Sequence, residues 1–236
     1  MADLVKKGDF IAIDYVGKVK ETGQIFDLTN EEVAKKEKIH QEGDKFEPST
    51  IVVGAGHVLK GLDVQLEDLE IGKKVTLEIS SDDAFGPRNP ELSTLVPIKF
   101  FKKEKIAPMP GMPVNIGGQR GIVQTASGGR VRVDFNHPLA GKNLEYELTV
   151  LKKVTDNKEQ IKALFKYHLP KSNPADLSLE LKEKTVEITT PKSDEQTRRF
   201  INLTKDIIAK DILKYVAGIE QIKIVDILDK TNVKLD

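Results

Sequence analysis

Residues 52–63 read VVGAGHVLKGLD, and three glycines fall within eight residues of this stretch. Glycine-rich loops bind phosphates in two well-defined spacings, so each spacing can be tested. The dinucleotide fingerprint requires glycine where Leu59 stands, and the P-loop requires lysine and a hydroxyl side chain where Leu62 and Asp63 stand. The spacing argues against nucleotide binding, so the glycines need another explanation.

The apolar residues around this stretch predict one short helix. Val58, Leu62, Leu66 and Leu69 recur at steps of four, four and three, which places them in a single apolar stripe. Gly72 then provides a typical stop signal. Between residues 28 and 47 the chain is polar, and a solvated excursion is the preferred interpretation, although a short exposed helix at 30–38 remains open.

Strands are predicted on both sides of the helix. Apolar and polar residues alternate with the period of a half-buried strand at residues 10–16, 75–79 and 144–150. In the last of these, one face carries four apolar side chains, Leu144, Tyr146, Leu148 and Val150. The first part of the chain is therefore predicted to be a β-rich domain with one short helix.

Residues 87–136 differ in charge and composition from the segments around them. They carry eight basic and three acidic residues, a net charge of +5, whereas residues 1–86 with 137–153 carry −6. Apolar residues are concentrated here, both internal methionines among them, and RVRVDF at 130–135 predicts a strand after a turn at 127–129. We interpret the segment as an insertion, with chance variation in a small sample as the alternative.

The last segment, residues 154–236, predicts a third domain of α-β-β-α-β order. It shows a short helix at 157–167 and a pair of alternating strands at 177–181 and 185–189. A long helix capped by Ser193 or Asp194 then runs to Gly218, and a final strand follows at 221–228. The long helix is predicted to bury one apolar face, made of Phe200, Leu203, Ile207, Ile208 and Ile212.

Composition limits the class of protein. With 39% hydrophobic and 31% charged residues, the 236-residue chain is expected to be globular. No stretch approaches the roughly 20 apolar residues that span a bilayer, and MADLVKKGDF lacks the apolar run of a signal peptide. The absence of cysteine excludes disulfides, thiol catalysis and Cys-ligated zinc. We expect a cytoplasmic protein without membrane contact.

Four motifs in the first segment resemble the FKBP-type peptidyl-prolyl cis-trans isomerases. They are YVG at 15–17, TGQIFD at 22–27, VLKGL at 58–62 and DAFG at 83–86. The interruption after AFG and the return through FNHPLAGKNL resemble the SlyD-like branch, in which an inserted chaperone domain interrupts the flap. With its extra C-terminal module, the chain resembles the long-chain archaeal form of this family.

The resemblance implies an α+β fold of three domains. The isomerase domain would comprise residues 1–86 and 137–153, an antiparallel sheet wrapped on a short helix. The small β-rich insert-in-flap domain would comprise residues 87–136, and the C-terminal α+β domain residues 154–236. In such a fold Gly54 and Gly56 would turn the chain from a strand into the helix, and Gly61 would let that helix pack close to the sheet.

The resemblance also implies an apolar pocket for the proline ring. Carried over position by position, the site would consist of Tyr15, Phe26, Asp27, Val58, Leu59, Leu62, Phe85 and Tyr146. The backbone N–H of Leu59 would hold the substrate carbonyl, and Asp27 would lie at the pocket edge, held by Tyr15. Rotation about the prolyl bond requires no metal, cofactor or nucleophile, and none is expected here.

This sequence departs from the family pattern at three positions. Leu62 stands where a tryptophan is usual, Phe85 replaces a tyrosine, and Ser49 stands where many members have an aromatic residue. These changes predict a wider pocket, weak binding of macrolide inhibitors and a loose preference for the residue before proline. The four histidines are isolated in sequence and the chain has no histidine-rich tail, so no metal site is expected.

The insert suggests a second activity. We predict that its apolar side chains bind unfolded or partly folded proline-containing polypeptides, with Leu95, Val96, Ile98, Phe100, Phe101, Ile106, Met109 and Met112 as the candidate residues. The alternative is that these side chains form the core of the insert itself. Nucleic-acid binding is disfavoured, because the basic insert lacks the interleaved aromatic residues of a base-stacking surface.

Two further questions remain open on the sequence alone. A pocket altered at Leu62 and Phe85 could belong to a non-catalytic holdase chaperone instead of an isomerase. The C-terminal helix could use its apolar stripe for internal packing, for a second client surface or for a homodimer, which is the preferred interpretation.

Overall fold

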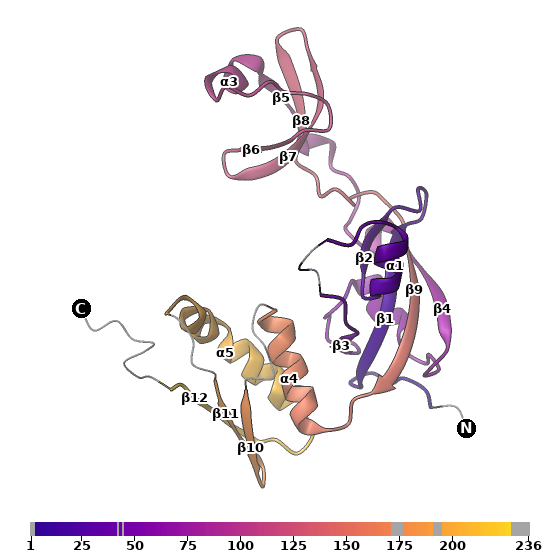
Figure 1. The fold of residues 1–236 in the computed structure, drawn as a ribbon, viewed down its shortest axis with the longest axis vertical. Coiled ribbons are helices and arrows are strands. Elements are labelled where there is room, and N and C mark those ends of the chain that lie inside the picture. The colour runs from indigo at the N-terminus through magenta and orange to yellow at the C-terminus, as the bar shows by residue number, and fades with distance from the viewer. Residues whose placement is uncertain (1–2, 42, 44, 171–176, 191–194, 228–236) are drawn as a thin grey trace, which may run out of the picture. The chain divides into compact units, whose positions relative to one another are not determined.

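A computed structural model describes residues 3–41, 43, 45–170, 177–190 and 195–227. The chain forms two compact units, each continuous in space but not in sequence. The first comprises residues 1–17, 27–77 and 146–236, and the second comprises residues 18–26 and 78–145. Figure 1 traces the chain through both units.

A five-stranded sheet supports the first unit. Its strand order is β2-β1-β9-β4, and β3 pairs antiparallel with β1 in addition. The bounds are β1 Phe10–Val19, β2 Ile25–Leu28, β3 Ser49–Val52, β4 Lys74–Ile79 and β9 Leu144–Lys153. The three strands predicted from alternation are confirmed as β1, β4 and β9, and the predicted apolar face of β9 is buried.

Two short helices accompany this sheet. Helix α2 (Lys60–Gln65) is shorter than the predicted apolar stripe, although Leu62 and Leu66 are both fully buried. Helix α1 (Glu31–Lys36) begins at Asn30, whose side chain accepts a hydrogen bond from the N–H of Val33. The short exposed helix that the sequence left open at 30–38 is therefore present, and most of its residues are exposed although Ala34 is buried.

The glycine-rich loop before α2 is a binding site for the chain's own carboxylate. Gly54 and Gly56 have positive φ angles of 76° and 73°, which side chains with a Cβ rarely adopt. Their N–H groups both donate to Asp63, at 2.8 and 2.9 Å. The prediction that these glycines turn the chain into the helix is confirmed, and the buried Asp63 on α2 fixes that turn.

The C-terminal part of the first unit contains two helices over a small mixed sheet (Figure 1). The elements are α4 Asn157–His168, β10 Ser178–Lys182, β11 Thr185–Thr189, α5 Glu195–Tyr215 and β12 Gln221–Val225. Strand β11 pairs antiparallel with β10 and parallel with β12. The predicted order of helices and strands is confirmed, whereas the predicted cap at Ser193 or Asp194 lies outside the described residues.

Helix α4 and the main sheet share one hydrophobic core. Phe10 of β1 and Val52 of β3 pack in the same buried cluster as Ile161, Leu164 and Phe165 of α4. The N–H of Val154 also donates to the carbonyl of Phe10, at 2.8 Å. The C-terminal module is therefore packed against the sheet rather than tethered to it.

Helix α5 buries only part of its predicted apolar face. Ile208 and Ile212 are fully buried, together with Ile201 and Val216. Phe200, Leu203 and Ile207 are instead 51%, 77% and 53% exposed. The sequence prediction of one buried face is wrong for these three residues, because they follow each other at steps of three and four on a second side of the helix.

The second unit is built around a separate antiparallel sheet with strand order β5-β8-β7-β6. Its elements are the 3₁₀ helices η1 Ser81–Asp83 and η2 Pro90–Leu92, followed by β5 Ser93–Pro97, α3 Ile98–Lys103, β6 Pro113–Ile116, β7 Gln119–Ser127 and β8 Arg130–Asp134. The strand predicted from RVRVDF is confirmed as β8. The charge and composition of this segment thus mark a separate β-rich fold.

The insert has a core of its own, to which several of the residues predicted to bind clients contribute. Phe101 is 1% exposed and packs with Val114, Val123, Val131 and Val133. The prediction of an exposed Phe101 is wrong. Four other candidates are partly buried against this core, namely Val96, Ile98, Ile106 and Met112. The remaining three are exposed, Leu95 at 49%, Phe100 at 38% and Met109 at 64%.

No helix in the described part of the chain is both long and apolar enough to cross a membrane.

Candidate active site

In the first unit, Tyr15 contacts two other residues of the predicted site. The hydroxyl of Tyr15 on β1 donates to the carboxylate of Asp27 on β2, at 2.8 Å. The ring of Tyr15 lies against the ring of Tyr146 on β9, with centroids 5.7 Å apart and planes tilted by 56°. Three neighbouring strands therefore contribute one residue each to a surface with apolar rings beside a carboxylate.

The position of Tyr15 is fixed by a polar network that sequence reasoning missed. The N–H of Tyr15 donates to the hydroxyl of Thr29 at 2.8 Å, and the N–H of Thr29 donates to the carbonyl of Tyr15 at 3.0 Å. The hydroxyl of Thr29 donates in turn to the carboxylate of Asp14. The carboxylate of Asp14 also accepts a hydrogen bond from the side chain of Asn30, at 3.2 Å. This network links β1 to the start of α1, and no motif or periodic pattern in the sequence pointed to Thr29 or Asn30.

Both tyrosines are held in the neutral form. Burial raises the pKa of Tyr15 well above its usual value, and the negative charge of Asp27 and the hydrogen bond to it add to this effect. Burial likewise raises the pKa of Tyr146, with a smaller contribution from Asp27. Tyr15 therefore remains a hydrogen-bond donor to Asp27 throughout the physiological pH range.

The start of α2 supplies the next three predicted residues. Leu62 is 1% exposed, and Val58 and Leu59 are half-buried. Leu59 is the residue that precedes the helix, and its carbonyl accepts hydrogen bonds from the N–H groups of Leu62 and Asp63. Within the described residues, no partner is recorded for the N–H of Leu59 itself.

The other two predicted residues, Phe26 and Phe85, belong to the second unit. Phe26 is half-buried and directly precedes Asp27 on β2. Phe85 stacks on the ring of His137, with centroids 4.2 Å apart and planes only 9° from parallel. This contact joins the two chain segments that enter and leave the insert, and it was not expected from the sequence.

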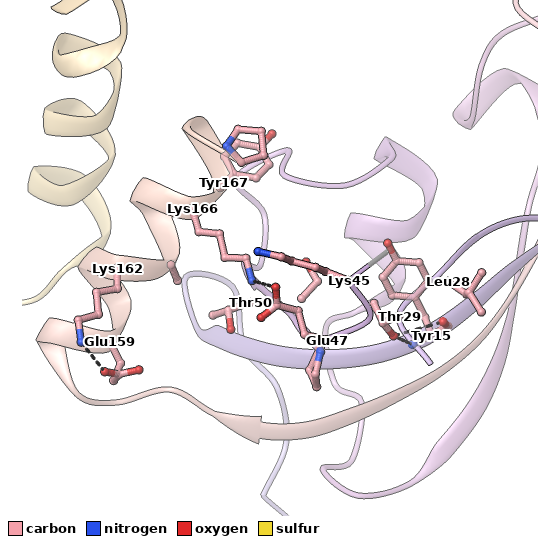
Figure 2. Close-up of a pocket in the computed structure, with 14 residues that line it drawn as sticks. Tyr15, Leu28, Thr29, Lys45, Glu47, Thr50, Glu159, Lys162, Lys166 and Tyr167 are labelled. Atoms are coloured by element: carbon pink, nitrogen blue, oxygen red, sulfur yellow. Dashed lines mark hydrogen bonds and ion pairs between the residues drawn. The ribbon is translucent and has the colours of Figure 1, made fainter. Parts of the chain in front are cut away.

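A hollow of about 620 Å³ adjoins Tyr15 and was not predicted (Figure 2). One wall comes from β1, β3 and the residues just before β3, and the other wall comes from helix α4. Tyr15 is the one member of the predicted site set that lines it. No local sequence pattern pointed to this hollow, because its two walls are more than a hundred residues apart in the chain.

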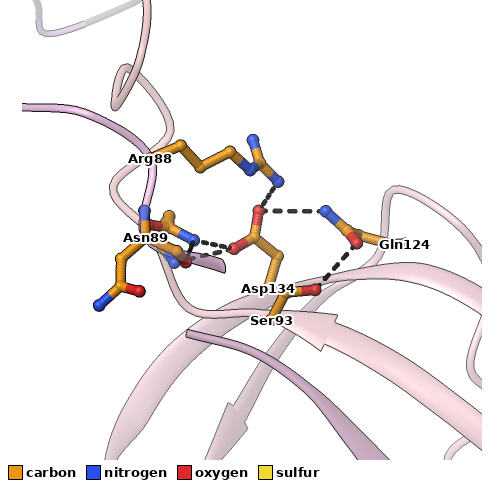
Figure 3. Close-up of polar contacts among 6 residues, drawn as sticks. Arg88, Asn89, Ser93, Gln124 and Asp134 are labelled. Atoms are coloured by element: carbon orange, nitrogen blue, oxygen red, sulfur yellow. Dashed lines mark hydrogen bonds and ion pairs between the residues drawn. The ribbon is translucent and has the colours of Figure 1, made fainter. Parts of the chain in front are cut away.

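A second polar cluster lies at the base of the insert (Figure 3). The carboxylate of Asp134 pairs with Arg88 and accepts hydrogen bonds from Gln124, at 3.2 Å, and from Asn136, at 3.0 and 2.7 Å. Burial alone would raise the pKa of Asp134, but the hydrogen bonds from Asn136 and the charge of Arg88 outweigh it and lower that pKa. The cluster connects the two segments that join the insert to the rest of the chain.

Comparison with known protein families supports each part of this architecture. Residues 2–101 match the family model described as FKBP-type peptidyl-prolyl cis-trans isomerase. Residues 94–139 match the model of the FKBP26 IF domain, and residues 157–229 match the model of the FKBP26 C-terminal domain. Every large segment recognised in the sequence thus has a counterpart in this group of proteins.

Individual relatives agree. The chain is 32% identical over 150 residues to the short-type peptidyl-prolyl cis-trans isomerase of Methanocaldococcus jannaschii, an alignment that covers 64% of this chain and 94% of that protein. It is 32% identical over 107 residues to a probable FKBP-type 16 kDa peptidyl-prolyl cis-trans isomerase of Pseudomonas fluorescens, covering 44% of this chain and 71% of the relative. The corresponding Escherichia coli K12 protein is 29% identical over 115 residues, with coverage of 44% and 72%.

The sequence motifs, the antiparallel sheet with its short helix α2, the separate insert sheet and these relatives all agree. The chain belongs to the FKBP-type peptidyl-prolyl cis-trans isomerases, as a member with an FKBP26-like insert-in-flap domain and C-terminal domain.

Proposed function

We propose that this isomerase acts on prolines in unfolded or partly folded polypeptides, and that its insert holds those polypeptides near the active site. The proposed catalytic set is Tyr15, Phe26, Asp27, Val58, Leu59, Leu62, Phe85 and Tyr146. The observation that supports it best is the contact of Tyr15 with both Asp27 and Tyr146. A cytoplasmic location, expected from the cysteine-free sequence, belongs to the same proposal.

The chemistry requires a surface that favours a twisted amide over a planar one. The barrier of about 18–20 kcal/mol arises because rotation destroys amide resonance. The twisted amide has less charge separation than the planar one, so an apolar pocket disfavours the planar form. About 5.5 kcal/mol of such differential stabilisation gives a rate enhancement of about 10⁴. Apolar side chains such as Leu62 and Tyr146 suit this task.

Two polar groups would orient the substrate in that pocket. The N–H of Leu59, which precedes helix α2, has no recorded partner among the described residues and would donate to a substrate carbonyl. Asp27 is exposed and is held by the hydroxyl of Tyr15, so its carboxylate would face the carbonyl that rotates. Neither group exchanges a proton in this mechanism, because no covalent bond breaks.

A protease-free isomerisation assay on a short proline peptide tests the catalytic assignment. We expect Phe26→Ala and Asp27→Ala to lower kcat/KM, because each removes a side chain assigned to the pocket. Lys152→Ala, at an exposed position on the same strand as Tyr146, serves as a surface control. Activity equal to that of the unaltered protein in both pocket variants would contradict the assignment.

The proposed client surface of the insert is smaller than the sequence suggested. Leu95, Phe100 and Met109 are exposed apolar side chains on a segment with a net charge of +5. Methionine and aromatic side chains adapt to varied partners, which suits binding of unfolded chains. Binding at this surface would raise the local concentration of prolines near the active site.

Replacement of Leu95, Phe100 and Met109 by serine tests this division of labour. We expect the triple variant to keep its activity on a short proline peptide and to lose much of its acceleration of proline-limited protein refolding. Lys99, Lys102 and Lys105 replaced by serine provide a control for the same region. Equal losses in both assays would refute a separate client surface.

We further propose that helix α5 forms a homodimer. Phe200, Leu203 and Ile207 lie at steps of three and four and are all more than half exposed. An apolar stripe of this kind on a surface helix is typical of an interaction face. Light scattering of a Leu203→Glu variant would detect a shift from dimer to monomer, whereas an unchanged mass would oppose the proposal.

A further inference from the structure

The hollow between helix α4 and the main sheet has a free strand edge on one wall. Strand β3 pairs with β1, with Ile51 opposite Ile11 and Thr50 opposite Ala12. The N–H of Val53 donates to the carbonyl of Asp9 at 3.0 Å, so the main-chain groups of Val53 face β1. In an antiparallel pair this orientation alternates from residue to residue. The main-chain groups of Ile51 therefore face β1, and those of Val52 and Thr50 face away from it.

The outward-facing main-chain groups of Val52 and Thr50 differ in their hydrogen-bond partners. The N–H of Val52 donates to the ring nitrogen Nδ1 of His57, at 3.2 Å. The N–H and carbonyl of Thr50 have no recorded partner among the described residues, and Thr50 lines the hollow. An exposed strand edge of this type can pair with an extended polypeptide, which supplies the missing hydrogen bonds.

The side chains around this edge carry a surplus of positive charge. Lys45, Lys162 and Lys166 line the hollow together with Glu47 and Glu159. Lys166 pairs with Glu47, and Lys162 pairs with Glu159 at 3.4 Å (Figure 2). Among the described residues Lys45 has no ion pair, so the described side chains that line the hollow carry one more positive charge than negative charges. A segment with acidic side chains therefore fits this hollow better than a basic one.

The hollow is also continuous with the candidate active site through one side chain. Tyr15 lines the hollow, and its hydroxyl donates to Asp27 at 2.8 Å. A polypeptide whose proline lies beside Asp27 and Tyr146 needs only to pass Tyr15 to reach Thr50. A backbone-binding edge next to a proline-binding surface is therefore available to one and the same chain.

We propose that this hollow is a second binding subsite for the polypeptide substrate, formed with the help of the C-terminal domain. The substrate segment next to the proline pairs with the edge of β3 at Thr50, and its acidic side chains lie near Lys45 and Lys162. The C-terminal domain thereby gives the isomerase a preference for extended substrates with acidic flanks. The proposal rests on the isomerase activity and is independent of client binding by the insert.

The test compares three proline peptides on the full-length protein. One contains only the proline and its immediate neighbours, and the other two extend it with flanks rich in glutamate or in lysine. The unaltered protein is expected to have its highest kcat/KM on the glutamate-flanked peptide, and added salt should reduce this advantage. A kcat/KM that is equal for all three peptides overturns the proposal.

Variants on helix α4 locate the effect. Lys162→Glu reverses a charge in the hollow, and Lys158→Glu makes the same change on the same helix at an exposed position that does not line it. The quantity to compare is the ratio of kcat/KM on the glutamate-flanked peptide to kcat/KM on the short peptide. Lys162→Glu should lower this ratio by about three- to tenfold, because one or two partly exposed charge contacts contribute about that much. Lys158→Glu should leave that ratio unchanged, and equal effects of the two variants overturn the proposal.

Two neutral variants test the backbone contact. Thr50→Pro removes the N–H that faces the hollow. The hydrogen bonds to β1 stay, because the main-chain groups of Thr50 face away from β1, and proline is tolerated on an edge strand. Ala163→Phe, on helix α4, fills the hollow from its other wall. Each variant should lower kcat/KM on both extended peptides relative to kcat/KM on the short peptide. If Thr50→Pro does not fold, the result for Ala163→Phe decides the test alone. If Ala163→Phe keeps the ratio of kcat/KM on the extended peptides to that on the short peptide, the proposal is overturned. If the unaltered protein has no activity on the short peptide, the assigned active site is refuted instead.

Discussion

Among single side chains, Tyr15 connects more parts of this molecule than any sequence pattern indicated. It donates to Asp27, lies against Tyr146, is fixed by Thr29 and lines the hollow next to helix α4. Its ring and hydroxyl therefore act on different neighbours. A substitution that removes only the hydroxyl can separate the orientation of Asp27 from the packing of the ring.

Tyr15→Phe is expected to lower kcat/KM on a short proline peptide by about two- to tenfold, because one hydrogen bond is worth about 0.5–1.5 kcal/mol net. The ring contact with Tyr146 stays, so the free energy of unfolding should fall by no more than the worth of this hydrogen bond, about 0.5–1.5 kcal/mol. Asp27→Asn is the companion variant, since an amide oxygen still accepts from Tyr15. An unchanged kcat/KM in Tyr15→Phe would show that the hydroxyl does not position Asp27 for catalysis.

Alkaline pH should destabilise the protein through its buried tyrosines. Because burial raises the pKa of Tyr146 above the usual value of 10.0, the unfolded chain loses this proton before the folded chain does. Its contribution to stability is complete below pH 10.0 and decreases as the pH rises toward the folded pKa. The slope is about 1.4 kcal/mol per pH unit for one tyrosine.

Urea unfolding of the unaltered protein and Tyr146→Phe, from about pH 7 to about pH 11, measures this slope. The variant should lose less stability above pH 10, because phenylalanine does not ionise. Any packing cost of the substitution is already present at neutral pH and cancels in the comparison. If the free energy of unfolding fell with pH equally steeply in the two proteins, the raised pKa of Tyr146 would be contradicted.

Among the helices and strands, the loop that leads into α2 shows how far sequence reasoning extends. Spacing correctly argued against a phosphate site, and the positive φ of Gly54 and Gly56 confirms the predicted turn. In the sequence, Asp63 counted only as a departure from the P-loop pattern. In the fold, Asp63 is the anion that the glycine N–H groups bind, at 2.8 and 2.9 Å.

Asp63→Asn should therefore destabilise the start of helix α2. The amide keeps one acceptor and directs an NH₂ group at a second N–H donor, so one charge-assisted hydrogen bond is lost, about 1.5–3 kcal/mol. Leu59 and Val58 depend on this turn, and kcat/KM should fall with stability. Asp68→Asn makes the same chemical change at an exposed position just beyond α2. If urea unfolding showed that the two variants are equally stable, this role of Asp63 would be refuted.

Local periodicity predicted the elements well, and it predicted their partners poorly. The alternation in residues 144–150 and the order of the C-terminal elements were confirmed, since both depend on neighbours in sequence. Phe101 and Phe200 were misplaced in opposite directions, the first being buried and the second exposed. Such choices depend on which segments meet in three dimensions, and a single sequence does not encode that in any local pattern.

The complete chain illustrates the same point through its cores. The sequence suggested three domains, but the packing of α4 places the main sheet and the C-terminal helices around one buried cluster. Phe10 and Val52 contribute to that cluster from the sheet, and Phe165 contributes from α4. The sheet β5–β8 has a different core, built around Phe101. This arrangement predicts two cooperative unfolding events instead of three.

Calorimetry of the full-length protein and two core variants tests that prediction. Phe165→Ala creates a cavity worth about 3–5 kcal/mol in the shared cluster, so one transition that includes both the main sheet and the C-terminal helices should move to lower temperature. Phe101→Ala makes the same change in the core of the insert and should move only the other transition. Because Phe10 on β1 packs in the same cluster as Phe165, fluorescence or exchange probes on β1 should follow the Phe165 transition. A different result is that Phe165→Ala destabilises the C-terminal helices while β1 keeps its original melting temperature. In that case the shared core does not unfold as one unit, and the three-domain interpretation of the sequence describes the stability better.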